Sequence, residues 1–184
     1  STPVYTSNHE SRTDGSLIVW NAHGQFTGLN DPTTAFVMGA RIHDRQPFVI
    51  AEMPRLPTPP DVDGDIVVWG EYDDANSGTI RGKDLTTGDI VTIATGEETV
   101  DSVVVSDGWA VWRSHTLTSA SIRARNLYEP GEPITLARAA AGPAGMPLGM
   151  PRVDDGWIAW TESHDSEYTG YNRLVALRTG ETEP

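Results

Sequence analysis

The chain has 184 residues, which suits one domain or at most two, and 38% of them are hydrophobic, so a disordered or fibrous protein is excluded. Its net charge of −13 argues against nucleic acids and anionic membrane surfaces as partners, because phosphate binding needs clustered Lys and Arg. No apolar run approaches the ~20 residues that span a bilayer, and the absence of cysteine excludes disulfides and thiolate metal sites.

Four segments along the chain share an Asp-Gly pair, a short apolar run and a closing Trp. In chain order they are T-D-G-S-L-I-V-W at 13–20, V-D-G-D-I-V-V-W at 62–69, S-D-G-W-A-V-W at 106–112 and D-D-G-W-I-A-W at 154–160. The closing tryptophans are therefore spaced by 49, 43 and 48 residues. Within the second unit, β-rich runs at about 66–72, 78–85, 89–94 and 99–105 are separated by turn residues.

The apolar runs of these units are continuous and do not alternate with polar residues. Residues 17–19 and 66–68 are apolar at consecutive positions, which is typical of a strand buried on both faces. Helical periodicity is nearly absent: residues 137–141 favour a helix by composition, but Gly142 and Pro143 follow at once. Four strands in a unit of 43–49 residues indicate a propeller blade.

The sequence thus predicts an all-β fold, a β-propeller built of four-stranded antiparallel blades, with four blades in this chain. Residues 1–184 would form a single domain, and its blades would occupy about 7–52, 58–95, 99–137 and 150–180. Three arrangements stay open: a small closed ring, half of a larger propeller completed by a second copy, or a piece of a longer polypeptide. Residues 1–6 form a possible closing strand for the fourth blade, since an outermost strand tolerates Pro3 at its edge.

The repeated pattern resembles the TolB-type and related WD40-like β-propeller repeats of bacterial extracytoplasmic proteins. The resemblance lies in the Asp-Gly turn, the apolar run with its Trp, and a later Thr-Gly turn with a short strand, as at Thr87-Gly88 and Thr179-Gly180. It implies a periplasmic, cell-surface or secreted location. Such proteins include scaffolds and the propeller domains of oligopeptidases, so the resemblance predicts architecture more narrowly than function.

The second Asp-Gly turn carries extra carboxylates that suggest calcium. Asp61, Asp63 and Asp65 alternate as in a calcium loop, but the twelfth residue from Asp61 is Tyr72 where an EF-type loop needs a bidentate Glu. The other three turns keep Asp-Gly and lose the flanking acids. We interpret the shared part as a tight turn, with calcium as a possible feature of this blade alone and no other cofactor expected.

A second repeat-related set follows the tryptophans. His23, Tyr72 and His115 stand three residues after their Trp, and His164 stands four after. These positions lie near the loop between the second and third strands of a blade, on the face opposite the Asp-Gly turns. A ring of imidazoles could hold a metal or supply general bases, although loop positions commonly favour polar residues for solvation alone.

The chain lacks G-x-S-x-G, H-E-x-x-H and P-loop motifs, so no catalytic residue is assigned. Pro-rich segments at 53–60 and 139–151 carry Met and Leu on the same face as the histidines, where they would form a protein-contact surface or plug the central channel. We interpret the chain as a non-enzymatic interaction or scaffold module that binds a protein or polysaccharide through this loop face, with homo-oligomers possible. The alternative is an enzyme, either a hydrolase or lyase, or the substrate-gating propeller of a larger peptidase.

Overall fold

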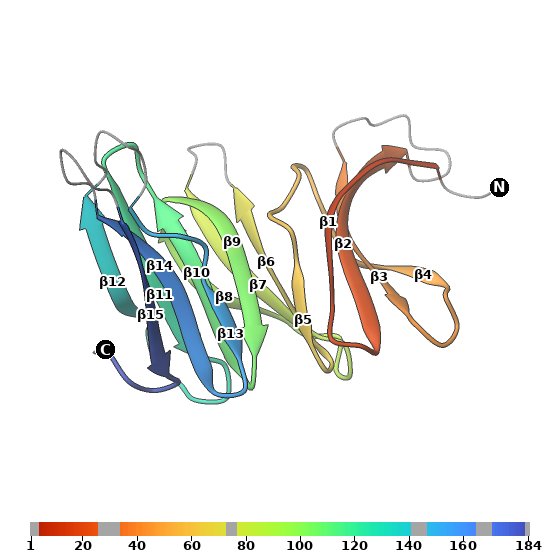
Figure 1. Ribbon diagram of the computed structural model, residues 1–184. Helices are drawn as coiled ribbons and strands as arrows, with labels where there is room; N and C mark the ends of the chain where they lie inside the picture. The colour runs from red at the N-terminus through yellow and green to blue at the C-terminus, as the bar shows by residue number, and fades with distance from the viewer. Residues whose placement is uncertain (1–3, 26–33, 73–76, 141–146, 165–170, 183–184) are drawn as a thin grey trace.

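The computed structural model describes residues 4–25, 34–72, 77–140, 147–164 and 171–182 (Figure 1). All regular structure in this part of the chain is β, arranged as four antiparallel sheets in which sequence neighbours pair as simple meanders. We call these sheets blades 1 to 4. The predicted all-β propeller architecture with one blade per repeat is therefore confirmed.

The strands of the four blades follow the chain from the inside of the arc outward. Blade 1 contains β1 (Val4–Thr13), β2 (Leu17–Gln25), β3 (Ala35–Arg41) and β4 (Pro47–Met53). Blade 2 contains β5 (Asp61–Asp63), β6 (Ile66–Tyr72), β7 (Gly78–Asp84) and β8 (Ile90–Glu97). Blade 3 contains β9 (Thr99–Ser106), β10 (Trp109–His115), β11 (Ser119–Asn126) and β12 (Ile134–Ala140). Blade 4 contains β13 (Arg152–Asp154), β14 (Trp157–His164) and β15 (Tyr171–Arg178) within the described residues.

The blades stand side by side in chain order and form an open arc (Figure 1). The innermost strands β1, β5, β9 and β13 are neighbours in that order. Blades 1 and 4 lie at opposite ends of the row, so the structure has the form of a partial propeller and the small closed ring is not formed.

The predicted closing strand at residues 1–6 is corrected by the pairing of β1. Val4 and Tyr5 pair with Gln25 and Gly24 of β2, so the described part of this segment belongs to blade 1 and not to blade 4. Pairing with the adjacent strand closes a short loop, whereas reaching blade 4 would close a loop of nearly the whole chain. The shorter loop costs less conformational entropy.

The repeat tryptophans of blades 2, 3 and 4 each pack against the blade that precedes them. Trp69 shares a buried cluster with Val19 and Val37 of blade 1. Trp112 packs in the same way with Val68 and Ile80 of blade 2. Trp160 packs with blade 3, and all three indoles are 0–2% exposed. These contacts explain the consecutive apolar residues, since one side of the strand contacts the preceding blade and the other side contacts the next.

The Asp-Gly pairs form the turns between the first and second strands, as predicted. Asp107 and Gly108 both have positive φ, of 51° and 75°, in the two-residue loop between Ser106 and Trp109. A loop with positive φ at both positions matches the right-handed twist of the flanking strands, and Asp followed by Gly suits it. Asp155 and Gly156 repeat this geometry, with φ of 46° and 72°.

These turns also bind one another from blade to blade. The Asp14 carboxylate accepts a hydrogen bond from Gly64 N at 3.0 Å, and Asp63 accepts one from Asp107 N at 2.7 Å. Asp107 in turn accepts one from Gly156 N at 3.1 Å. We call this series the turn ladder. It links all four blades along one face of the arc by the aspartates that the repeat shares.

Removing apolar volume between two blades should destabilise the whole chain. Ile80→Ala is expected to lower the free energy of unfolding by about 2–5 kcal/mol, because Ile80 is fully buried beside Trp112 of the next blade. Leu117→Ala is the matched control, since Leu117 is 94% exposed and should change stability little. Urea denaturation followed by Trp fluorescence measures both, and equal effects would contradict the packing described above.

Candidate functional site

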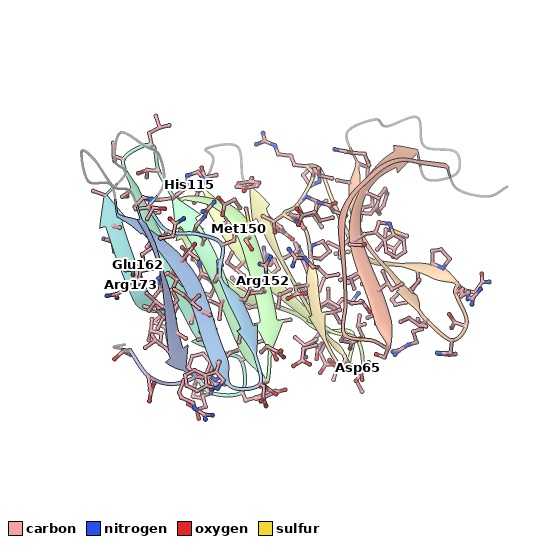
Figure 2. All side chains as sticks on the ribbon, in the orientation of Figure 1. Asp65, His115, Met150, Arg152, Glu162 and Arg173 are labelled. Atoms are coloured by element: carbon pink, nitrogen blue, oxygen red, sulfur yellow. The ribbon has the colours of Figure 1, made fainter. Side chains whose placement is uncertain are left out.

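The predicted binding-face residues lie at the ends of second strands, away from the Asp-Gly turns. Tyr72, His115 and His164 are the last residues of β6, β10 and β14, and His23 pairs with Ser7 and Ala35 near the end of β2. Figure 2 shows His115 and Asp65 at opposite ends of the blades. The two repeat-related sets therefore occupy opposite faces, as predicted, while the side chain of His164 lies outside the described residues.

Two of these residues come together on one carboxylate. His115 Nε2 lies 3.2 Å from Asp101 Oδ2, and Asp101 belongs to β9, the innermost strand of blade 3. Tyr72, from blade 2, hydrogen-bonds with the backbone of Val100, the residue before Asp101, and the Asp101 charge acts on its phenol. Arg113 Nε donates to both Asp101 oxygens, at 2.9 and 3.1 Å, and its Nη2 donates to Oδ2 as well. We call Tyr72, Asp101, Arg113 and His115 the Asp101 cluster.

The Asp101 cluster is fixed from several sides. Arg113 Nη1 donates to the Leu148 carbonyl at 2.6 Å, so the guanidinium also ties blade 3 to the segment that enters blade 4. Burial and the negative charge of Asp101 raise the pKa of Tyr72 above its ordinary value, although a hydrogen bond with the Val100 backbone acts in the opposite direction. Tyr72 is therefore a neutral phenol at physiological pH, and its neighbours form an ion pair.

This arrangement suits recognition better than proton transfer. Both oxygens of the Asp101 carboxylate already accept charge-assisted hydrogen bonds from Arg113, so the carboxylate is engaged within the protein. Across the described residues, no three His, Asp or Glu side chains are grouped so that they could hold a metal ion. Of the predicted set, His115 contacts Asp101 and Tyr72 lies within reach of the same charge.

Sequence reasoning missed Asp101 and Arg113. Arg113 directly follows a repeat tryptophan, but the equivalent residues Asn21, Gly70 and Thr161 are uncharged, so the repeat gives no signal for a cation. Asp101 lies on a different strand, and only the pairing of β9 with β10 brings it beside Arg113 and His115. A search for acids on innermost strands opposite the histidines would have included Asp101 among several candidates.

The Pro-rich segments mostly connect blades. Leu148 and Met53 are buried, and Thr58 joins blade 2 through a hydrogen bond from Gly70 N to its hydroxyl at 2.8 Å. Asn21 Nδ2 donates to the Pro57 carbonyl at 2.9 Å, which links blade 1 to the same segment. Met150 remains 47% exposed and stands two residues after Leu148, whose carbonyl accepts from Arg113. Met150 is therefore an exposed apolar residue of these segments that could contribute to a contact surface near Arg113.

A second surface feature lies at the outer edges of blades 2 and 3. A groove of about 270 Å³ has Val91, Ile93 and Tyr128 among its lining residues, together with the polar residues Lys83 and Asp89. Tyr128 packs over Gly108, where a Cβ would come within 2.1 Å of the ring. Tyr128 can take this position because Gly108 beneath it has no side chain. No residue from the predicted binding face lines the groove.

The three aspartates considered for calcium are each engaged by the protein. Asp61 accepts a hydrogen bond from Val105 N at 3.0 Å, and Asp63 accepts one from Asp107 N in the turn ladder. Asp65 pairs with Arg41 at 3.2 Å, across the boundary between blades 1 and 2. These contacts direct the three carboxylates to separate neighbours, so their arrangement does not fit a calcium loop. Their observed role is to join blade 2 to the blades on either side.

Comparison with known proteins identifies the fold. No family model matches the sequence, and no curated protein matches it. Among solved structures, the β-propeller domain of the Trilobed protease from Pyrococcus furiosus superposes with a TM-score of 0.72 at 10% identity, over 98% of this chain and 57% of that one. One chain of a nidogen/laminin complex matches with a TM-score of 0.62 at 15% identity, over 94% of this chain and 60% of that one.

TolB from Acinetobacter baumannii matches with a TM-score of 0.64 at 12% identity, over 96% of this chain and 42% of that one. The chain therefore spans about half the length of these solved propellers. The likeness bears out the TolB-like β-propeller fold that the repeat predicted. At such low identity it concerns the fold alone.

The titration of Asp61 should be visible in stability. Burial raises the pKa of Asp61, although the Val105 N–H and the charges of Arg12 and Arg152 act against this. A raised folded-state pKa favours the protonated form, so the stability contributed by Asp61 is present at low pH and is lost as the pH rises through that pKa. Asp61→Asn removes the charge and keeps an oxygen for Val105 N, so we expect a melting temperature a few degrees higher at pH 7 and unchanged at pH 3.

Asp14→Asn is the control with the opposite sign. Burial alone would raise the pKa of Asp14, but hydrogen bonds from Leu17, Ser16 and Gly64 lower it below its ordinary value. The ionised carboxylate therefore stabilises the fold at neutral pH, and Asp14→Asn should lower the melting temperature at pH 7 but not once the native carboxylate is protonated. Differential scanning calorimetry from pH 3 to 8 measures both variants. A calcium-dependent rise that Asp61→Asn abolishes would instead support the calcium hypothesis.

Proposed function

We propose that the chain is a non-enzymatic interaction module that binds a protein through the loop face carrying the Asp101 cluster. The observation that supports this is the convergence of Tyr72 and His115, from two different blades, on a carboxylate held by Arg113. The earlier alternative of a polysaccharide partner is kept as an outcome of the test below.

The chemistry of the Asp101 cluster resembles that of protein-binding hot spots. Tyr and Arg are enriched at such positions because they bury a large area and form directional hydrogen bonds. Tyr72, Arg113 and His115 are all partly exposed, so they can contact a partner without unfolding the blade. The carboxylate already fixes the side chains of Arg113 and His115, which reduces the entropy lost on binding.

The net charge specifies what kind of protein would associate fastest. At −13, the chain attracts cationic surfaces over long range and repels acidic ones. Within the Asp101 cluster the charges of Asp101 and Arg113 offset each other. Long-range attraction is therefore expected to bring a basic partner to the surface, and local contacts with Tyr72, His115 and Met150 are expected to orient it.

The fold is compatible with this role and with the alternative. A propeller of this fold occurs in the nidogen/laminin complex, which is a complex of two proteins. The proposal includes the extracytoplasmic location that the resemblance implied. No helix in the described residues could cross a membrane.

The alternative is a substrate-gating propeller of a peptidase, since the matched Pyrococcus furiosus domain belongs to a protease. Under that alternative the loop face would contact peptide only transiently. It would do so beside a catalytic domain, so the Asp101 cluster would affect turnover by that domain more than equilibrium binding. A hydrolase or lyase activity within the chain itself is the remaining alternative.

A peptide array tests the proposal without a known partner. We expect the labelled chain to bind a subset of Lys- and Arg-containing peptides, and binding should weaken at least tenfold in Tyr72→Ala and His115→Ala. His43→Ala is the matched control, because His43 is an exposed histidine at the opposite end of blade 1 and should bind like wild type. Binding should also fall as salt rises, since the attraction between charges is screened.

The same samples separate the competing functions. Peptide binding that is equal in all three variants would reject the Asp101 cluster as the contact site. Cluster-dependent binding to oligosaccharides but not to peptides would identify a carbohydrate partner, and peptides or oligosaccharides shortened during incubation, detected by mass spectrometry, would identify an enzyme.

A further inference from the structure

One position of the repeat is buried in three blades and exposed in the fourth. It lies on the third strand, opposite the residue that follows the repeat Trp, and it is occupied by Val37, Ile80, Ile122 and Leu174. The first three side chains are 0% exposed, whereas Leu174 is 71% exposed. Since the first three share buried clusters with Trp69, Trp112 and Trp160 of the following blade, Leu174 lacks the tryptophan that its equivalents have.

The outward side of blade 4 is apolar around Leu174. Trp157 is 43% exposed and Ala176 is exposed on the same side of β14 and β15. The Arg178 guanidinium stacks on the Trp157 ring at 4.4 Å. We call Trp157, Ala159, Leu174 and Ala176 the tail face. The equivalent side of every other blade is covered by the next blade, so the tail face has the composition of an interface between blades.

Blade 1 carries the matching element at the other end of the arc. Trp20 is the repeat Trp of blade 1, and it is half-buried where Trp69, Trp112 and Trp160 are fully enclosed. Trp20 packs against three residues of its own blade that are already buried within the chain, Ala22, Phe36 and Met38. The open part lies next to the Asp14-Gly15 turn and consists of Ile18, Trp20 and Ala40, which we call the head face.

The turn ladder is also incomplete at both ends in a complementary way. Asp107 of blade 3 accepts from Gly156 N, and Asp155 occupies the same place in the turn of blade 4 with the same positive φ. Among the described residues no further turn lies beyond Asp155 to donate to it. At the other end, Gly15 N donates to Thr13 of its own turn. In blades 2 and 3, by contrast, Gly64 N and Asp107 N donate to an aspartate of the preceding blade.

From these two complementary ends we propose that the tail face binds the head face of a second copy of this chain. Trp20 of one copy would cover Leu174 of the other, and the Asp155 turn would lie beside the Asp14-Gly15 turn, as the Asp107 turn lies beside the Asp155-Gly156 turn within the chain. The contact repeats, between chains, the interface that already occurs three times within the chain. It is independent of the Asp101 cluster, which lies at the opposite end of the blades from the turn ladder.

Two such contacts close the assembly. A head-to-tail interface forms a ring if its rotation closes and a filament if it does not. Two arcs of four blades make a ring of eight, which is within the range of four to eight blades that propellers adopt. We therefore expect a closed pair in which both tail faces and both head faces are covered.

Sedimentation equilibrium of the full chain is the first test. The expected mass is twice the 19.9 kDa of one chain. Leu174→Glu should lower the dimer affinity at least a hundredfold, because it places a charge in an apolar contact, and should leave the circular dichroism of the chain unchanged. Leu117→Glu, at a 94% exposed loop position, should remain dimeric. A wild-type chain that stays monomeric, a Leu174→Glu variant that dimerises normally, or a ladder of higher masses would overturn the proposal.

Engineered cysteines test the direction of the contact, because the chain has no cysteine of its own. A mixture of Ser16→Cys and Asp155→Cys chains should form a disulfide between the two variants under mild oxidation. Each variant alone should form little disulfide. A dimer in which Asp155→Cys crosslinks readily to itself would mean that two tail faces meet, and it would overturn the head-to-tail arrangement.

Discussion

The packing of a tryptophan from one blade onto the sheet before it is the contact on which the rest of the structure depends. A single four-stranded sheet has two apolar sides and cannot bury either of them alone. Trp69, Trp112 and Trp160 each fill the space between two blades, and Val68 and Val111, which directly precede the first two, contact the blade that follows. Burial on both sides is what makes the apolar runs continuous and leaves no room for the alternation of a half-exposed strand. The same contact also makes every blade dependent on its neighbour, so stability in this arc depends on interfaces more than on the sheets themselves.

The turn ladder adds specificity to this apolar packing. Hydrophobic contact between two sheets tolerates small rotations, whereas a hydrogen bond from a backbone N–H to a carboxylate has a narrow range of geometry. Asp14, Asp63 and Asp107 fix the turn end of each blade relative to the next. Farther out, Lys83 and Arg125 donate to the carbonyls of Ile50 and Ile93 on the outermost strand of the preceding blade, at 2.6 and 2.5 Å. Each boundary from blade 1 to blade 3 therefore has an apolar centre with polar contacts at the turn end and at the outer edge.

The repeat made the architecture predictable from the sequence, because four copies of a pattern average out local ambiguity. The blade period, the place of the Asp-Gly turns and the two opposite faces all followed from the spacing of the tryptophans. Val4 and Tyr5 pair within blade 1 and not with blade 4, which the sequence did not indicate because the pairing of an end strand has no repeat to constrain it. The Ala-rich residues 137–140, which favour helix by composition, form part of β12 because tertiary pairing with β11 outweighs propensity. The site was harder, since Tyr72 and His115 follow from the repeat, whereas Asp101 and Arg113 are particular to one blade and meet only through strand pairing.

The two ends of the arc differ from its interior in the residue that faces the outermost strand of the neighbouring blade. The position of Lys83 and Arg125, which pair with Val67 and Ala110, is occupied in blade 1 by Ala40, which pairs with Ile18. The cations at this position donate hydrogen bonds to backbone carbonyls on the outermost strand of the preceding blade. The same position in blade 4 is Leu177, which pairs with Ile158, so a cation stands there in the two inner blades and an apolar residue in the two end blades. A ring of two copies would also present two Asp101 clusters around one axis, so that a partner with two binding sites would bind more tightly than either site alone allows.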